Sequence, residues 1–274
     1  MVKLNYYWRI LATGFCFISF GIGGLVLSTL VFPVINLLPL KKDTSRRIAQ
    51  RIVHYCFRFF LWEMQFVGVL RIDIQDKQKL LEDNCNLIVA NHPTLIDVIL
   101  IIAQLKEVDC AVKHTHWNNP FVSGVIKATG YISNSSPEQL LQECVQNINS
   151  GRSLIIFPEG TRTTPGEEIK FKRGAAHVAL RCNKDLRPIT IVCNESSLSK
   201  GEKWYQVPLN GPMHISVTVH DLIATSKYKE DAKNEPQATR HLTRFLHAHY
   251  QKEICSNDRF STRNKTADYR LTRS

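Results

Sequence analysis

The sequence predicts an α/β domain with a mainly parallel sheet flanked by helices, attached to an N-terminal membrane-embedded helical segment. Two observations predict this fold class. Residues 10–40 contain no charged side chain, and from residue 70 onward short apolar runs typical of buried strands alternate with segments of helical periodicity. The chain of 274 residues is long enough for one large catalytic domain and an attachment segment.

The uncharged segment is too long for a cleavable signal peptide, because a continuous helix of this length would measure about 46 Å. Pro33 interrupts it, which leaves two interpretations: a single span near residues 11–32, or a bent, re-entrant pair of helices. More basic residues follow the segment, within residues 41–47, than precede it. This bias predicts a membrane location with the folded domain on the cytoplasmic side, at the inner membrane if the cell is bacterial.

Residues 44–62 are predicted to form an amphipathic helix. Arg47, Arg51, His54 and Arg58 recur on one face, and apolar side chains that include aromatics recur on another. Such a helix is suited to the headgroup layer of a membrane. The alternative is a helix that packs on the folded domain and keeps a solvated charged side.

The remaining elements follow from the alternation of apolar runs and helical periodicity. Strands are predicted at residues 70–74, 86–90, 108–113, 129–133, 153–157, 188–193 and 214–219, and helices at residues 94–104, 119–128, 137–149, 174–182 and 236–250. The predicted organisation is a membrane anchor with its amphipathic helix at 1–62, a catalytic domain at 63–258 and a basic tail at 259–274.

The net charge of +11 is concentrated in two stretches. Residues 41–58 hold six basic side chains against one acidic, and residues 259–274 hold five against one. A nucleic-acid-binding protein more often spreads basic residues over a folded face that carries a recognisable reading element. The sequence contains no such element, so membrane lipids with anionic headgroups, or an acidic donor molecule, are the expected partners, and nucleic acid is not.

The first candidate motif, Asn91-His92-Pro93-Thr94-Leu95-Ile96-Asp97, directly follows a predicted buried strand. Within one helix His92 and Asp97 would lie about 140° apart. They meet if His92 lies in the strand-to-helix turn and Asp97 in the first helical turn, so that the carboxylate orients a catalytic imidazole. Thr94 and Asp97 also match a capping box, a structural role that is compatible with the catalytic one.

The second motif, Phe157-Pro158-Glu159-Gly160-Thr161-Arg162, follows another predicted strand. Pro158 ends the strand, Gly160 permits a tight turn, and the Arg162 guanidinium suits bidentate binding of phosphate. Lys172 lies just before a predicted helix N-terminus, which favours anions. A solvated basic loop with a salt bridge from Glu159 to Arg162 is the alternative. Because ligands collect beyond the carboxyl ends of strands in open α/β sheets, both motifs are expected to converge on one crevice.

Several other chemistries lack their motifs. The sequence has no G-x-S-x-G elbow, no G-x-x-x-x-G-K-[ST] phosphate loop and no H-E-x-x-H zinc motif. No metal site is predicted.

Taken together, the two motifs resemble those of the glycerolipid acyltransferase family, which includes bacterial 1-acylglycerol-3-phosphate acyltransferases. The resemblance covers roughly residues 70–220, in the family's order and spacing. It implies that His92 and Asp97 are the catalytic pair and that the block at 157–162, extended by Phe171-Lys172-Arg173-Gly174-Ala175, binds the acceptor's phosphate. Arg187-Pro188-Ile189 is similar to the family's fourth block. The implied substrate-binding residues are Thr94, Glu159, Gly160, Thr161, Arg162 and Lys172.

The resemblance implies transfer of a fatty acyl group from acyl-CoA or acyl carrier protein to the hydroxyl of a lysolipid, with no cofactor. The chain departs from the family in its second block, where Gly130-Tyr131-Ile132-Ser133-Asn134 lacks the usual cation. This departure leaves other lipid-like acceptors open beside 1-acylglycerol-3-phosphate. A thioesterase and a non-catalytic lipid-binding relative are the further alternatives.

Overall fold

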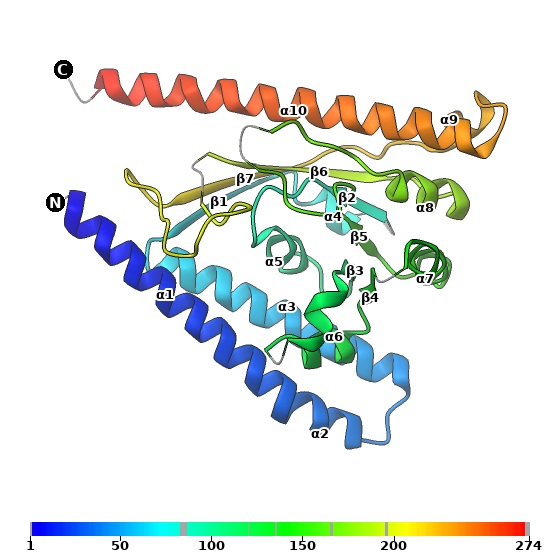
Figure 1. Cartoon of the computed structure of the whole chain (residues 1–274), viewed down its shortest axis with the longest axis horizontal. Helices are drawn as coiled ribbons and strands as arrows, with labels where there is room; N and C mark the ends of the chain where they lie inside the picture. The colour runs from blue at the N-terminus through cyan, green and yellow to red at the C-terminus, as the bar shows by residue number, and fades with distance from the viewer. Residues whose placement is uncertain are drawn as a thin grey trace.

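A seven-stranded mixed sheet forms the centre of the molecule (Figure 1). The computed structural model describes residues 2–82, 87–119, 121–134, 136–164, 167–194 and 197–271, with side chains described as far as residue 256. The strands are β1 (Leu70–Gln75), β2 (Leu87–Ala90), β3 (Asp109–Val112), β4 (Ile132–Ser133), β5 (Leu154–Ile156), β6 (Arg187–Cys193) and β7 (Met213–Val219). Their order across the sheet is β1-β7-β6-β2-β5-β3-β4.

Only the β6–β7 pair is antiparallel among the strand pairs of the described residues. The predicted α/β fold with a mainly parallel sheet and flanking helices is therefore confirmed. The four residues of β2 are all buried, in agreement with their uninterrupted apolar sequence. The first six residues of β6 are buried too, although Arg187 and Thr190 are among them. Because β7 reverses direction and β1 runs parallel to it, the starts of β1 and β7 lie at the same end of the sheet as the carboxyl ends of β2, β5 and β6.

Helices cover both faces of the sheet. They are α1 (Val2–Val26), the π-helix η1 (Leu27–Val31), α2 (Phe32–Leu37), α3 (Lys42–Phe66), α4 (Lys79–Glu82), α5 (Asp97–Ile102), the 3₁₀ helix η2 (His114–Asn118), α6 (Ser123–Thr129), α7 (Pro137–Asn149), α8 (Gly174–Cys182), α9 (Ser226–Glu230) and α10 (Glu235–Leu271). Figure 1 shows α10 and α8 over one face, and α3, α5 and the N-terminal helices over the other. Each face has its own buried apolar cluster.

Among the boundaries that differ from the predictions, three have identifiable reasons. Helix α5 begins at Asp97 instead of residue 94 because Leu95 N–H is bonded outside the helix, to Leu198 O. Strand β4 begins at Ile132 because Gly130, at φ 65°, forms the left-handed cap of α6. Helix α10 continues to Leu271 instead of ending at residue 250, since residues 251–271 contain neither Gly nor Pro.

The N-terminal apolar segment forms one long helix that packs against α3. Lys3–Leu37 is long and apolar enough to cross a membrane, since an 18-residue stretch within it has a mean hydropathy of 2.2. Pro33, which has no backbone N–H to donate, does not end this helix. The preceding residues form a π-helix at Leu27–Val31, and α2 continues in the same direction. After a turn, α3 returns alongside, and Phe20 contacts Phe57 and Phe60 across the two helices.

Helix α3 packs on the domain and keeps Arg47, Arg51 and Arg58 exposed, which is the alternative predicted from the sequence. Arg47 and Arg51 pair with Glu107, and the ring of buried His54 bonds Ile102 O. Arg46 pairs with Asp109, which is fully buried. Toward its C-terminal end, the exposed surface of α3 also carries four aromatic side chains, those of Tyr55, Phe59, Trp62 and Phe66.

Candidate active site

The two sequence motifs lie side by side at the carboxyl ends of β2 and β5. These strands are neighbours in parallel register, with Val89 opposite Ile156. His92 therefore lies next to the loop that follows Phe157, and the rings of the two residues are 4.5 Å apart between centroids. Thr163 N–H donates to His92 O at 3.1 Å, which joins the two loops through the backbone.

His92 and Asp97 form a hydrogen-bonded pair. The distance from His92 Nδ1 to Asp97 Oδ2 is 2.8 Å, with the imidazole 17% exposed and the carboxylate fully buried. Asp97 also accepts from Thr94 N–H at 2.7 Å and from the Thr94 hydroxyl. Thr94 thus fixes the carboxylate, and the carboxylate orients the imidazole, so that Nε2 is the nitrogen available for proton transfer.

Glu159 supports the same turn from the other strand. Its side chain is 5% exposed, and Oε1 accepts from His92 N–H at 2.7 Å. Oε2 accepts from the Thr163 hydroxyl. Burial raises the pKa of Glu159 to about 7, although the hydrogen bond from His92 N–H lowers it. The carboxyl group therefore holds the loop of His92 in place, and no salt bridge joins it to Arg162 within the described residues.

Arg162 lies partly buried beside the loop that follows β6. Its Nη1 donates to Leu198 O at 3.0 Å and to Ser199 O at 3.3 Å. No other partner of this guanidinium is found in the part of the chain that the structure describes. Its remaining donors are therefore available to an anion.

Lys172 and Gly160 lie together on the same loop system. Lys172 N–H donates to Pro158 O at 2.7 Å, and a Cβ on Gly160 would stand 2.9 Å from Lys172 Nζ. Gly160 has φ +69°, a conformation that favours glycine. Thr161 is exposed. Lys172 and Arg162 therefore bring two cations to the loop that follows β5.

Two supporting residues were not predicted to belong to the site. Asn91 extends the β2–β6 ladder, because its amide donates to Ile191 O and accepts from Ile191 N–H, both at 2.7 Å. Tyr250 of α10 is fully buried, and its hydroxyl donates to Val89 O at 2.6 Å while accepting from Ile189 N–H at 3.3 Å. The position of Asn91 inside the first motif was a usable signal, whereas nothing in the sequence around Tyr250 indicates its role.

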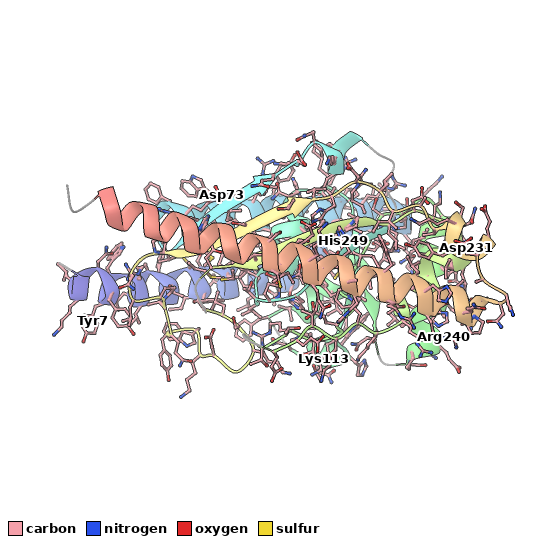
Figure 2. All side chains as sticks on the ribbon, turned by 90° about the horizontal axis from the view of Figure 1, so that it is seen from above. Tyr7, Asp73, Lys113, Asp231, Arg240 and His249 are labelled. Carbon is pink, nitrogen blue, oxygen red and sulfur yellow. The ribbon has the colours of Figure 1, made fainter. Side chains whose placement is uncertain are left out.

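The second family block, which lacks its cation, is held by polar contacts. Asn134 Oδ1 accepts from His114 N–H at 2.9 Å, and the His114 ring lies 3.2 Å from Ser133 Oγ. Figure 2 shows neighbouring Lys113 on the surface of the molecule. This end of β3 and β4 is therefore polar, although Ser133 and Asn134 are uncharged.

The sequence profile of the Acyltransferase family matches residues 71–193, a stretch that contains both motifs. Over this stretch the predicted resemblance to the acyltransferases is confirmed. The enzyme class of the chain, an acyltransferase, is thereby confirmed. The chain is 24% identical over 193 residues to the 1-acyl-sn-glycerol-3-phosphate acyltransferase of Borreliella burgdorferi, covering 68% of this chain and 74% of that one.

Further relatives extend the similarity beyond the matched stretch. The chain is 25% identical over 243 residues to the 1-acyl-sn-glycerol-3-phosphate acyltransferase of Cocos nucifera, covering 86% of this chain and 72% of that one. The crystal structure of PlsC, the 1-acyl-sn-glycerophosphate acyltransferase of Thermotoga maritima, superposes with a TM-score of 0.68 at 17% identity. It covers 93% of this chain and 98% of that one, which shows that the fold is shared.

Proposed function

We propose that this acyltransferase is membrane-bound and transfers a fatty acyl group from an acyl thioester to the free hydroxyl of a lysophospholipid, with 1-acylglycerol-3-phosphate as the preferred acceptor. The observation that carries the proposal is the 2.8 Å contact between His92 Nδ1 and buried Asp97. This pairing orients an imidazole for general-base catalysis. The names of the relatives support the acceptor.

The proposed reaction needs one base and no covalent enzyme intermediate. Nε2 of His92 removes the proton from the acceptor hydroxyl as its oxygen attacks the thioester carbonyl. The new C–O bond forms and the C–S bond breaks, and the imidazolium returns its proton to the departing thiolate. General-base catalysis by His92 typically contributes about 10²- to 10⁴-fold in rate, and Asp97 stabilises the imidazolium that forms.

The acceptor's phosphate is assigned to the loop that follows β5. Arg162 retains donors that its two carbonyl contacts do not use, and exposed Lys172 lies against Gly160. Gly160 and Thr161 complete this loop, while Thr94 and Glu159 act on the loop and the catalytic pair instead of on the ligand. A phosphate held here would place a glycerol hydroxyl toward the imidazole of His92.

The donor is proposed to be acyl-CoA or acyl carrier protein, and no cofactor is required because the thioester supplies the activated acyl group. The apolar helix Lys3–Leu37 and the exposed aromatic face of α3 support membrane binding. A membrane location suits a reaction whose acceptor and product both carry acyl chains. The basic residues that follow the apolar helix favour the cytoplasmic side.

Product analysis tests the proposal. Purified protein in neutral vesicles is given a radiolabelled acyl-CoA or acyl carrier protein thioester, with 1-acylglycerol-3-phosphate, other lysolipids or no acceptor. We expect phosphatidate from wild type, loss of product in His92→Ala, and retention in His241→Ala, which removes an imidazole from α10. Free fatty acid that is unaffected by added lysolipid would identify a thioesterase. Equal background turnover by wild type and His92→Ala would refute catalysis.

A further inference from the structure

A surface groove lies beside the N-terminal part of α1, at the start of β1 and before β7. Its polar lining consists of two arginines, Arg9 and Arg71, and three carboxamides, from Asn5, Gln65 and Asn210. No carboxylate lines it among the residues that the structure describes. Guanidinium and amide donors without an opposing carboxylate are the chemistry of an anion site.

Arg9 is the unusual member of this lining. Its side chain is 3% exposed, and Nη2 donates to Pro208 O at 3.0 Å and to Leu209 O at 2.9 Å. Nε is buried and has no partner. Within the described ranges no carboxylate lies within ion-pair distance of the guanidinium. Because a buried charge is costly unless it is paired, Arg9 lacks a counter-anion.

Arg71 provides a second guanidinium on the open side of the groove. It is exposed, and the described part of the chain offers it no hydrogen-bond or ion-pair partner. The carboxylate of Asp73, two residues further along β1, is engaged by His214 at 2.6 Å and does not line the groove. Arg71 is therefore free to bind an anion at the groove that Arg9, which has no carboxylate partner, also lines.

The surroundings of the groove are apolar. Trp8, which lines it, is 54% exposed, and neighbouring Phe66 is 74% exposed. Phe66 stacks on Trp62 with ring centroids 5.1 Å apart, which continues the aromatic face of α3. Trp8 belongs to the apolar helix Lys3–Leu37, and its indole N–H donates to Val67 O at 3.1 Å, which places this helix beside the groove. An anion bound here would adjoin the face that suits a bilayer, so an amphiphile fits better than a free ion.

The groove lies at the same end of the sheet as His92 but is separate from the candidate active site. The starts of β1 and β7 lie at this end because β7 reverses direction relative to β6. The loop between β6 and β7 joins the two places: Leu198 O accepts from Arg162, and Pro208 O accepts from Arg9. The groove therefore lies at the β1 edge of the sheet, where β7 and β1 are two and three strands away from β2.

We propose that this groove binds the phosphate of an anionic bilayer phospholipid. Arg9 and Arg71 contact the phosphate, the carboxamides contact the rest of the headgroup, and the acyl chains lie against Trp8 and Phe66. The occupant anchors the loop between β6 and β7 at the membrane surface. This site is independent of the acyl-transfer assignment, because its residues lie outside the loops of His92 and Arg162.

Vesicle binding of the full chain tests this site. Partition is measured onto vesicles of phosphatidylcholine alone and onto vesicles of equal parts phosphatidylcholine and phosphatidylglycerol. Arg71→Gln removes an exposed charge from the groove, and Asn210→Asp introduces a carboxylate into it. Lys3→Gln is the matched control, because Lys3 is exposed on α1 but does not line the groove. A second control, Arg240→Gln, lies far away: Figure 2 shows Tyr7 of α1 and Arg240 of α10 near opposite ends of the molecule.

We expect each groove variant to lower partition onto the anionic vesicles by about five-fold or more, the effect of one cation at an anionic surface. Partition onto phosphatidylcholine alone stays unchanged, and both control variants behave as wild type. Equal losses in Arg71→Gln and Lys3→Gln would overturn the site in favour of general surface attraction. Inorganic phosphate that raises the thermal midpoint of wild type in detergent, but not of Arg71→Gln, while anionic vesicles bind both equally, would overturn the lipid as occupant.

Discussion

Glu159 is expected to make the stability of the protein fall as pH rises toward neutrality, and Glu159→Gln is expected to remove this fall. Glu159 is 5% exposed, and burial raises the pKa of its carboxyl from 4.5 to about 7. Below pH 4.5 the folded and unfolded chains both hold the proton. Between pH 4.5 and 7 the unfolded chain has lost it and the folded chain retains it, so stability decreases with increasing pH in this window.

The magnitude follows from the width of the window. A displacement of about 2.5 pH units corresponds to about 3 kcal/mol, at about 1.4 kcal/mol per unit, as an upper estimate for one isolated group. Glutamine keeps an oxygen that can accept from His92 N–H, so the loop retains its strongest contact, 2.7 Å in wild type. The amide does not titrate. The free energy of unfolding of the variant therefore rises steadily relative to that of wild type from pH 4.5 to 7.

The assay is chemical denaturation in neutral detergent at a series of pH values. The quantity compared is the free energy of unfolding of Glu159→Gln minus that of wild type. Glu138→Gln, which removes an exposed carboxylate from α7, is the matched control. A difference curve for Glu159→Gln with the same pH dependence as the control would refute the assignment of this titration to Glu159.

Three further substitutions test the supporting contacts. Asp97→Asn should lower kcat by about 10³- to 10⁴-fold because the amide cannot fix the productive tautomer of His92; a loss below ten-fold in steady-state assays would contradict the pair. Tyr250→Phe should lower the free energy of unfolding by about 1 to 3 kcal/mol in thermal denaturation, since it removes the hydroxyl that bridges two buried backbone groups. Unchanged stability would mean that Ile189 N–H and Val89 O bond each other directly in the variant. Gly160→Ala should lower the free energy of unfolding by about 1 to 2 kcal/mol, because an alanine is strained at φ +69°. It should also raise the KM for the acceptor, because the new Cβ would displace Lys172. An unchanged KM would mean that Lys172 does not bind the acceptor.

The fold class could be predicted because both of its signals are local. Runs of buried strand residues and the uncharged N-terminal segment are readable from neighbouring residues alone. The reversal of β7 could not be predicted, because an alternating strand such as Met213–Val219 has the same pattern in either direction. The length of α10 was underestimated because helix ends are predicted from stop signals, and the C-terminal sequence contains none.

The candidate site was predictable to the extent that its residues follow strands. His92 and Glu159 come after neighbouring parallel strands, so their meeting follows from topology. Their detailed roles depend on burial: Glu159 was expected near the acceptor, and instead accepts from the backbone of His92. Tyr250 lies 161 residues from Val89, and no local pattern reports a contact of that kind.

The contacts of β2 explain why the site needs parts of the chain that surround its motifs. Ile189 N–H on β6 and Val89 O on β2 both bond the Tyr250 hydroxyl instead of each other, whereas Pro188, which has no N–H, faces β7 and accepts from His220 N–H. Tyr250 from α10 and Asn91 from the motif itself supply polar groups at this part of the ladder. Both residues hold the backbone just before His92, and so they fix the direction in which the chain leaves β2. An enzyme whose catalytic imidazole is displaced by about 1 Å loses much of its reaction rate. The C-terminal helix therefore belongs to the functional architecture, although the family profile ends at residue 193.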